Sequence, residues 1–438
     1  MAYSWELLEA AEKAAILRSI RSKDAPPPPR VVELSWQDRC NIDCFFCSTA
    51  ELRAGNRELT RERLERLFDE MQSLGVRGVR LMGGGEPLFR RDCADLIGAL
   101  GQRGLRINDV TTNGVLLTEP VVRALFSTGC DEIRVSLNAA DPASYATMMQ
   151  TTPKNFDRVV DNVRRAAAIK RETGARCAIK VQFLIYRDNY PQLPEMYRLF
   201  RETGADAFWL NGLYPVRPMP GMDENDVARM IELYEQVLAR DYFEHLERFS
   251  FWEQPVADRI AGAERRVFAA APLSRRARVK VRRVLTGGRR RDREAASLHE
   301  FCLVGWYSTT INANGDVVTC CILQDRKGAV LGNIGASSLS EIWLGEPYER
   351  FRAELREIME RRGQIGPGGR ARSVETVCAE KGACPARSYY WADDRPFRRE
   401  FHAMVESMTP PPGEPFATVG PPASRPLPAY PSQPAPVR

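Results

Sequence analysis

The alternation of apolar and polar residues predicts strands and helices that take turns over the first half of the chain. Short apolar runs indicate strands at 31–36, 79–82, 107–111, 133–137, 178–185 and 207–210. Amphipathic stretches between them indicate helices at 60–74, 92–103, 119–128, 155–173 and 191–203. Strands that alternate with helices are typical of a parallel sheet with right-handed crossovers, so the sequence predicts an α/β fold.

The stretches on either side of this alternation have other patterns. Residues 5–22 carry apolar side chains at helical spacing, and the prolines at 26–29 follow them as a linker. Residues 226–300 are mostly helical in pattern, whereas 301–395 contain cysteines within β-rich runs. Residues 408–438 are rich in proline and poor in large apolar residues, so we expect them to be disordered. The predicted segments are 1–30, 31–225, 226–300, 301–395 and 408–438.

Composition narrows the class of protein. Hydrophobic residues make up 44% of the 438 residues and charged residues 27%, a balance typical of globular proteins. The sequence lacks an apolar run of about 18 residues, the length of a membrane-spanning helix. Its N-terminus lacks the apolar core of a signal peptide, so the expected location is the cytoplasm. Thiols stay reduced there, so eleven cysteines favour metal or redox chemistry over disulfides.

Charge is unevenly distributed. The net charge is +6, and residues 265–293 hold twelve Lys or Arg against one acidic residue. A solvated, mobile insertion is one interpretation of this run, and an anionic partner such as a phosphorylated substrate is the other. Nucleic acid is not favoured, because Phe268 is the one aromatic residue in the run and a stacking platform needs several.

Three cysteines follow the first predicted strand closely. Cys40, Cys44 and Cys47 form a C-x3-C-x2-C motif on one short loop. Three thiolates can bind three irons of a 4Fe–4S cluster, which leaves the fourth iron open to another ligand. Zinc is the alternative, although structural zinc sites usually join a C-x2-4-C pair to a second pair downstream.

A glycine run ends the second predicted strand. Successive glycines let a ligand approach the backbone closely, but a run of this kind on its own also suits a plain strand-to-helix turn. The run and the residues that end it are Gly83, Gly84, Gly85, Glu86 and Pro87.

Together the two motifs resemble the signature of the radical S-adenosylmethionine (SAM) superfamily. The resemblance covers about residues 31–212 and implies a partial (βα)6 barrel. It implies that a 4Fe–4S cluster on Cys40, Cys44 and Cys47 binds the amino and carboxylate groups of SAM. Reductive cleavage of SAM in this family gives a 5′-deoxyadenosyl radical, which abstracts a hydrogen atom from the substrate. The resemblance also implies an electron donor such as flavodoxin or ferredoxin.

The resemblance extends to further SAM-binding residues. It places Phe46 near the adenine, and it places the glycine run near the methionine end of SAM. Asn113 and Ser136, at the ends of the third and fourth strands, correspond to polar residues that touch the ribose and carboxylate. The expected cofactor-binding residues are Phe46, Gly83, Gly84, Gly85, Glu86, Asn113 and Ser136.

A second set of cysteines lies in the C-terminal part of the chain. We interpret Asn314-Gly315 as a two-residue hairpin turn that brings Cys302 and Cys320 together. With two later cysteines they could ligate another 4Fe–4S cluster, although a structural zinc site is an alternative, and Cys321 could replace Cys320. The expected ligands are Cys302, Cys320, Cys378 and Cys384. We interpret the isolated cysteines as structural: Cys93, Cys130 and Cys177.

This C-terminal order resembles the auxiliary-cluster segments called SPASM and its shortened form, twitch. A full SPASM segment ends with C-x2-C-x5-C-x3-C, whereas only Cys378 and Cys384 remain here, so the resemblance implies one auxiliary cluster. The complete expected fold is therefore α/β: a partial (βα)6 radical SAM barrel followed by a small α+β SPASM/twitch-like cluster-binding domain.

The substrate follows from weaker signals. Related enzymes oxidise sugar or aminocyclitol intermediates of natural products, or modify ribosomal peptides and proteins. Only 39 residues precede Cys40, too few for a fused leader-recognition domain, so we expect a small-molecule substrate, an anionic one included. Redox-neutral dehydration or epimerisation of a sugar stays open as an alternative. Candidate residues at the barrel mouth are Trp209, Asn211, Tyr214 and Arg217.

Overall fold

A computed structural model describes residues 8–212, 222–241, 244–248, 254–272, 274, 302–324, 327–360, 400–401, 403–404 and 407. Within these residues the chain builds one ten-stranded sheet in the order β10-β9-β8-β1-β2-β3-β4-β5-β6-β7. Strands β1 to β7 run parallel to their neighbours. This arrangement confirms the α/β fold predicted from the alternating pattern.

The predicted strands and helices are all present, with small shifts at their ends. The six strands are β1 (Val31–Leu34), β2 (Gly78–Leu81), β3 (Arg106–Thr112), β4 (Glu132–Ser136), β5 (Ala178–Ile185) and β6 (Ala207–Gly212). The predicted helices are α1 (Ala10–Ser22), α3 (Arg61–Ser73), α4 (Cys93–Gln102), α5 (Glu119–Ser127), α7 (Lys154–Thr173) and α8 (Leu193–Thr203).

Other elements were not located individually by the sequence pattern. These are α2 (Ala50–Ala54), α6 (Pro142–Met149), α9 (Glu224–Asp241), β7 (Leu246–Arg248) and α10 (Gln254–Ala270). The C-terminal part contains β8 (Ser308–Ile311), β9 (Asp316–Val318), β10 (Gly332–Asn333), α12 (Leu339–Leu344) and α13 (Glu346–Glu360). Short 3₁₀ helices lie at Pro87–Phe89, Tyr190–Gln192, Val304–Trp306, Cys321–Leu323 and Lys327–Ala329.

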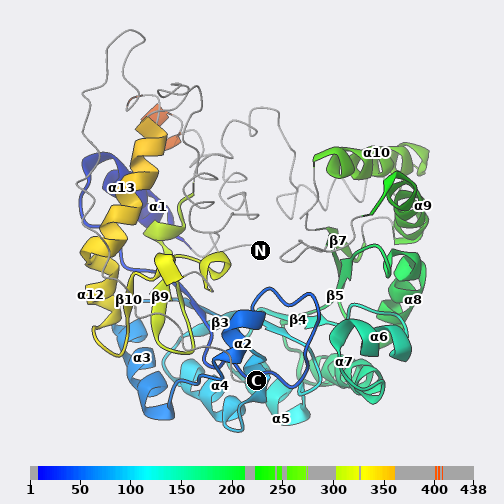
Figure 1. Cartoon of the computed structure of the whole chain (residues 1–438), viewed down its shortest axis with the longest axis horizontal. Coiled ribbons are helices and arrows are strands. Elements are labelled where there is room, and N and C mark those ends of the chain that lie inside the picture. The colour runs from blue at the N-terminus through cyan, green and yellow to red at the C-terminus, as the bar shows by residue number, and fades with distance from the viewer. Residues whose placement is uncertain are drawn as a thin grey trace, which may run out of the picture.

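The sheet is curved, and its helices lie outside it. In Figure 1, α3, α4, α5, α7 and α8 follow one another around the outer side of the strands. Helices α12 and α13 lie near β10, whereas α9 and α10 lie near β7. Strands β10 and β7 are the opposite ends of the sheet order, so the barrel is open on one side.

The C-terminal strands continue the barrel sheet. Strand β8 pairs with β1 in parallel, with Val31 opposite Ser308 and Leu34 opposite Ile311. Strands β9 and β10 then follow as antiparallel neighbours. The strand that leads into the first cysteine motif is therefore hydrogen-bonded to the barrel on one side and to the second cysteine segment on the other.

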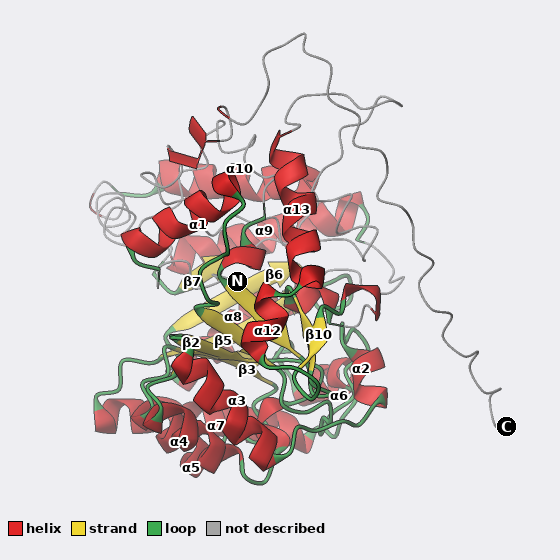
Figure 2. Cartoon of the chain, turned by 90° about the vertical axis from the view of Figure 1, so that its left-hand side faces the viewer, coloured by secondary structure: helices red, strands yellow, loops and turns green. Residues whose placement is uncertain are grey.

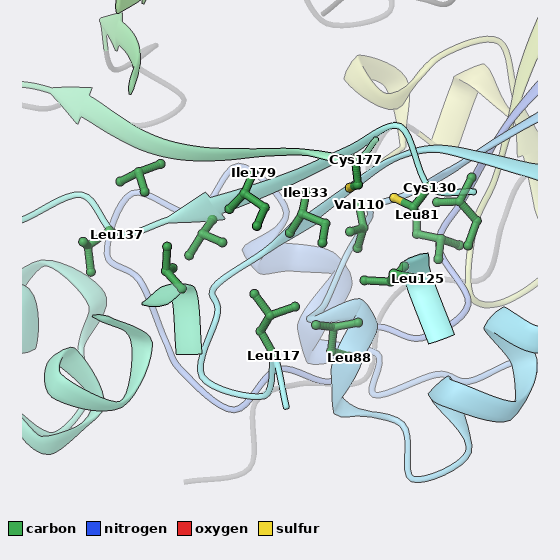
Figure 3. Close-up of a cluster of buried hydrophobic side chains, with 14 of the residues drawn as sticks. Leu81, Leu88, Val110, Leu117, Leu125, Cys130, Ile133, Leu137, Cys177 and Ile179 are labelled. Atoms are coloured by element: carbon green, nitrogen blue, oxygen red, sulfur yellow. The ribbon is translucent and has the colours of Figure 1, made fainter. Parts of the chain in front are cut away.

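The outer face of the sheet forms the main hydrophobic core. Figure 3 shows Leu81, Val110, Ile133 and Ile179 pointing from neighbouring strands toward the helices, and all four are 0% exposed. Parallel strands covered by helices bury such residues in continuous layers. Cys130 and Cys177, also in this view, are buried, and so is Cys93 on α4, as expected for structural cysteines.

A second hydrophobic core joins helix α1 to the C-terminal part of the structure. Ile16 and Ile20 of α1 are completely buried and pack in one cluster with Trp306 and with Phe351 and Leu355 of α13. Figures 1 and 2 both show α1 beside α13. The N-terminal helix, which the sequence pattern left as a segment of its own, therefore covers the second cysteine segment.

The hairpin before Cys320 differs from the predicted one. The N–H of Gly315 donates to the carbonyl of Asn312 at 2.8 Å, and the N–H of Asn312 donates to the carbonyl of Asp316 at 2.8 Å. Gly315 has φ of +87°, whereas Asn314 does not have a positive φ. The loop is therefore a type I turn completed by a glycine bulge, because a two-residue type I′ turn would need both central residues at positive φ.

None of the helices that the structure describes is both long and apolar enough to cross a lipid bilayer.

Candidate functional site

The loop that carries the first three cysteines lies where β1, β2 and β3 end. The N–H of Glu86, after β2, donates to the carbonyl of Arg39 at 2.9 Å. After β3, Asn113 Nδ2 donates to Asn41 Oδ1 at 2.8 Å. Arg53 of α2 donates from Nη1 to the Ile42 carbonyl at 3.0 Å. Three separate elements thus fix the loop at the carboxyl edge of the sheet, where ligands of parallel sheets bind.

The three thiols of the loop lie close enough to influence one another. Cys40, Cys44 and Cys47 are all half-buried. Burial raises the pKa of the Cys44 thiol well above its ordinary value, and the neighbouring Cys47 and Cys40 raise it further. Three thiolates packed this way repel each other unless a positive group lies between them. A bound metal cluster would supply that charge.

The three thiols of the loop are a donor set that is compatible with an iron–sulfur cluster. Among the residues described, no three His, Cys, Asp or Glu side chains converge on one metal position. A zinc ion needs its ligands within about 2.3 Å of one point. A cubane cluster instead binds each thiolate to a different iron, which spreads the sulfurs apart. The spacing of Cys40, Cys44 and Cys47 on one loop is therefore compatible with a 4Fe–4S cluster.

The glycine run packs directly against the start of the cysteine loop. A Cβ on Gly83 would lie 2.0 Å from Ser35 Oγ, and one on Gly85 would lie 2.1 Å from the carbonyl oxygen of Arg39. Gly83 also has φ of +148°, which side chains rarely adopt. The Gly84 N–H donates to Ser35 Oγ at 3.0 Å, and Thr49 Oγ1 donates to the Gly84 carbonyl at 3.1 Å. These glycines are thus required for the chain's own packing around residues 35–39.

Glu86 connects the ends of two strands. Its side chain is buried, and Oε1 accepts hydrogen bonds from the Thr112 hydroxyl at 2.6 Å and the Leu88 N–H at 3.1 Å. Oε2 accepts one from the Asn113 N–H at 2.7 Å. Burial raises the pKa of this carboxyl to about 7, against the lowering effect of the three donors. The carboxylate is engaged with the protein on both oxygens, so it supports Asn113 and the cysteine loop.

The other predicted cofactor residues meet at the same edge. Asn113 Nδ2 lies 3.8 Å from Cys40 Sγ in addition to its bond to Asn41. Ser136 Oγ donates to Gln182 Oε1 at 3.2 Å. Phe46 is half-buried, with its ring edge-on to Phe45 at a centroid distance of 5.4 Å. Asn113 thus contacts the cysteine loop directly and Phe46 is part of that loop, whereas Ser136 bonds to the neighbouring strand β5.

Helix α6 adds two residues that the sequence did not single out. Met149 Sδ lies 3.8 Å from Cys44 Sγ. Tyr145 is completely buried, and its hydroxyl lacks a hydrogen-bond partner among the residues described. Burial raises the pKa of Tyr145, and Cys44, Glu86 and Cys40 contribute in the same direction, so the hydroxyl lies within electrostatic range of both thiols. An acceptor such as a cluster sulfide beside these thiols would satisfy that hydroxyl. This orphaned group is a second observation that fits a cluster here.

The second cysteine segment brings two of its predicted ligands together. Cys302 and Cys320 pack against the same hydrophobic cluster. Burial raises the pKa of Tyr348, and Cys320 and Cys302 both raise it further, so both sulfurs lie near this ring. The backbone of Cys321 contacts the barrel, because its N–H donates to Glu33 Oε2 at 3.1 Å. The other two predicted ligands, Cys378 and Cys384, lie outside the described residues.

Comparison with known families decides the identity. Residues 34–207 match the radical SAM superfamily, and residues 302–364 match an iron–sulfur cluster-binding domain, SPASM. The chain is a radical SAM protein with a SPASM domain. Radical SAM domains bind a 4Fe–4S cluster and SAM, and SPASM domains bind auxiliary iron–sulfur clusters, which agrees with the two cysteine segments of this protein.

Curated relatives cover part of this radical SAM protein. A probable GTP 3',8-cyclase of Saccharolobus islandicus (strain M.14.25 / Kamchatka #1) is 30% identical over 196 residues, 44% of this chain and 61% of that protein. A probable GTP 3',8-cyclase of Methanothermobacter thermautotrophicus is 30% identical over 179 residues, 41% of this chain and 56% of that protein. The chain thus spans less than two thirds of the length of these relatives.

Solved structures share the fold over most of the chain. SuiB of Streptococcus suis has a TM-score of 0.53 at 19% identity and covers 78% of this chain and 72% of its own. The protein anSMEcpe, solved with SAM and the Kp18Cys peptide, has a TM-score of 0.51 at 14% identity. The match covers 87% of this chain and 99% of the anSMEcpe chain. At these identities the likeness establishes the radical SAM fold together with its C-terminal extension.

Proposed function

We propose that this protein cleaves SAM reductively and uses the resulting radical to remove a hydrogen atom from its substrate. One observation carries the proposal: the three thiols of Cys40, Cys44 and Cys47 lie together on a loop fixed at the carboxyl edge of the parallel strands. The 4Fe–4S cluster and SAM supply a 5′-deoxyadenosyl radical when bound. An external donor such as flavodoxin or ferredoxin supplies the electron.

The residues around the loop have separate proposed tasks. Phe46 on the loop, and the polar groups of Asn113 and Ser136 at the ends of β3 and β4, would contact SAM. Gly83 to Gly85 pack under the loop at the end of β2, and they would let the methionine end of SAM approach the backbone there. Glu86 acts through Asn113, since its carboxylate accepts a hydrogen bond from the Asn113 N–H at 2.7 Å. We therefore assign Glu86 to positioning and the other residues to SAM contact.

We further propose that the second cysteine segment holds an auxiliary cluster, which would serve as acceptor for a second electron from the substrate. Its ligands would be Cys302 and Cys320, which lie together, with Cys378 and Cys384 from beyond the described residues. Strand β8 follows Cys302 and pairs with β1, the strand that leads to Cys40, so both cysteine segments adjoin the same strand. Loss of a hydrogen atom, then of one electron and one proton, is a net two-electron oxidation of the substrate.

We propose a small polar substrate, a sugar or aminocyclitol intermediate of a natural product. The inner face of the sheet supports this, because charged and polar side chains line it: Glu33, Arg80, Asp109, Arg134, Lys180 and Gln182. Arg134 also lies over the ring of Trp209, 4.7 Å from its centroid. The curated relatives are named as probable GTP 3',8-cyclases, and GTP is a small molecule that contains a sugar. Tyr214 and Arg217, also predicted at the mouth, lie outside the described residues.

A ribosomal peptide is the second candidate substrate. The observation that favours it is the likeness to two structures over most of the chain. SuiB has been solved with its precursor peptide SuiA, and anSMEcpe with the Cp18Cys and Kp18Cys peptides. The same hydrogen abstraction would then take place on a peptide carbon.

The test measures 5′-deoxyadenosine. The protein is reconstituted anaerobically, reduced with dithionite and given SAM, with and without pools of aminocyclitols, aminosugars, nucleotide sugars or peptides. A large rise with one carbohydrate pool, and a product two mass units lighter, would support the proposed oxidation. A rise with the peptide pool would favour the second candidate, and an unchanged mass would indicate epimerisation. No SAM cleavage by protein with intact clusters would overturn the proposal.

Cysteine variants separate the two sites. We expect Cys40→Ala to abolish SAM cleavage and to reduce iron from about eight to about four atoms per chain. We expect Cys302→Ala to lose a similar amount of iron, yet to keep SAM cleavage and lose the oxidised product. Cys93→Ala is the matched control, because this cysteine is buried within α4 and should leave both readouts unchanged.

A further inference from the structure

A single carboxylate in the barrel holds the backbone of the second cysteine segment. Glu33 lies on β1 and is 0% exposed. Its Oε1 pairs with Arg80 of the neighbouring strand β2. Its Oε2 accepts hydrogen bonds from the Thr310 hydroxyl at 3.0 Å and from the Cys321 N–H at 3.1 Å. One side chain therefore joins the barrel to both β8 and the residue next to Cys320.

The charge of Glu33 belongs to a row that crosses the sheet. Thr310 is opposite Glu33, Glu33 is opposite Arg80, and Arg80 is opposite Asp109 in the strand register. Arg80 is completely buried and donates to Asp109 Oδ2 at 2.6 Å. Asp109 lies in turn 3.5 Å from Arg134 Nη2. Buried charges of this kind need their partners, because removal of one leaves another uncompensated.

The row has two ends with different neighbours. At one end Glu33 contacts the cysteine segment through Thr310 and Cys321, whereas Asp109 makes its contacts to arginines on β2 and β4. Both carboxylates neutralise the same Arg80. Glu33 differs from Asp109 because it also accepts a hydrogen bond from the Cys321 N–H, a contact that neutralising Arg80 does not require.

We propose that Glu33 is a positioning residue for the auxiliary cluster, which fixes the backbone beside Cys320 and sets a negative charge next to the cluster. The inference rests on the proposed assignment of Cys320 as a ligand. The hydrogen bond to Cys321 limits how far the Cys320 thiolate can move away from Cys302. The buried negative charge opposes the added electron of a reduced cluster, so it keeps the reduction potential lower.

The experiment isolates the auxiliary cluster. The parent is the full chain with Cys40, Cys44 and Cys47 replaced by alanine, so that the radical SAM cluster is removed. In this parent chain, Glu33→Gln is compared with the control Asp109→Asn. The control also removes one negative partner of Arg80, but Asp109 makes its contacts to arginines of the barrel rather than to the cysteine segment. The readouts are the electron paramagnetic resonance spectrum, the midpoint potential and the rate of iron release to a chelator.

We expect Glu33→Gln to raise the midpoint potential, change the spectrum and release iron about tenfold faster, as loss of one charge-assisted hydrogen bond implies. We expect Asp109→Asn to leave all three near the parent values. Equal effects of the two variants would mean that Glu33 only balances Arg80, and an unchanged Glu33→Gln spectrum would equally overturn the positioning role.

Two further results separate the possible failures. A parent chain without any cluster signal would overturn both Cys320 as a ligand and the role of Glu33, whereas SAM cleavage by the wild type would still stand. If Glu33→Gln does not fold, Thr310→Val removes one donor to the same oxygen and keeps the charge. We then expect faster iron release at an unchanged potential, and an unchanged release rate would contradict the proposal.

Discussion

The two cysteine segments of this protein are built in different ways. The first is complete within eight consecutive residues, Cys40 to Cys47, and polar bonds from the ends of β2 and β3 fix it. The second extends from Cys302 past Cys320 and packs on a hydrophobic core shared with α1 and α13. A local loop depends on close backbone contacts, whereas the second segment depends on helices far away in the sequence. Mutations should therefore disturb the two segments by different routes.

The largest expected effect comes from the backbone contact beneath the first segment. A Cβ at Gly85 would lie 2.1 Å from the Arg39 carbonyl oxygen and 2.5 Å from the Asp38 carbonyl carbon. Both atoms belong to the backbone directly before Cys40, so they cannot move without displacing the loop. We expect Gly85→Ala to lower the free energy of unfolding by more than about 4 kcal/mol and to abolish SAM cleavage. Urea denaturation and the 5′-deoxyadenosine assay measure the two effects.

Gly98→Ala is the matched control for this prediction. Gly98 lies inside α4, and a Cβ there would have nothing within 4 Å. The same substitution should stabilise the helix by about 0.5–1 kcal/mol and leave SAM cleavage intact. If Gly85→Ala were as harmless as Gly98→Ala, close packing would not explain the glycine run, and the run's role would rest on contact with the cofactor alone.

The second prediction addresses the core of the second segment. Ile16 of α1 is 0% exposed and packs in the cluster that also holds Cys302 and Cys320. We expect Ile16→Ala to lower the free energy of unfolding by about 2–5 kcal/mol through the cavity that it leaves. Auxiliary-cluster iron should fall while SAM cleavage is retained, as iron analysis and the 5′-deoxyadenosine assay would report.

Ile133→Ala provides the comparison in the barrel. Ile133 is equally buried but lies in the core between the sheet and its helices (Figure 3). We expect a similar loss of stability, now accompanied by loss of SAM cleavage with the auxiliary iron retained. The idea that α1 serves the second segment would fail if both variants lost iron in the same proportion.

The sequence predicted the barrel well because its evidence is local. Each strand and helix has its own periodic pattern, and the three predicted ligands of the first cluster lie on one loop. The role of the glycine run could not be predicted in full, since its contact with Ser35 and Arg39 exists only after β1 and β2 pair. Helix α6 was missed, although Asp141 followed by Pro142 is a capping signal, and Asp141 Oδ1 does accept from the Ala143 and Ser144 N–H groups.

The second segment was predicted less completely because its contacts are long-range. The apolar spacing predicted α1 but not what its apolar face packs against, which is a core formed with α13 and Trp306. The hairpin was expected, but its turn type was wrong: Asn314 and Gly315 are not the two central residues, because the turn begins at Asn312 and ends at Gly315. Glu33 gave no signal, since one acidic residue in a strand does not reveal a hydrogen bond to Cys321.

The smallest predicted effect tests whether the two regions unfold together. Ser338 caps α12 in the C-terminal region, where its Oγ accepts from the Glu341 N–H at 3.2 Å. Thr60 caps α3 in the barrel, where its Oγ1 accepts from the Arg63 N–H at 3.3 Å. Each change to alanine should cost about 1 kcal/mol, because it removes one acceptor from a helix N-terminus. Urea denaturation followed by circular dichroism and by tryptophan fluorescence would measure the cost.

The continuity of the sheet through β1 and β8 determines how these two caps should compare. If the regions form one cooperative unit, Ser338→Ala and Thr60→Ala each shift the same single transition by a similar amount, with both probes coincident. This is the outcome that we expect, because separation of the regions would break the β1–β8 pairing and expose Glu33 and Arg80. An early transition shifted by Ser338→Ala alone would instead show that the C-terminal region unfolds independently, and that Glu33 holds a contact the barrel can lose without unfolding.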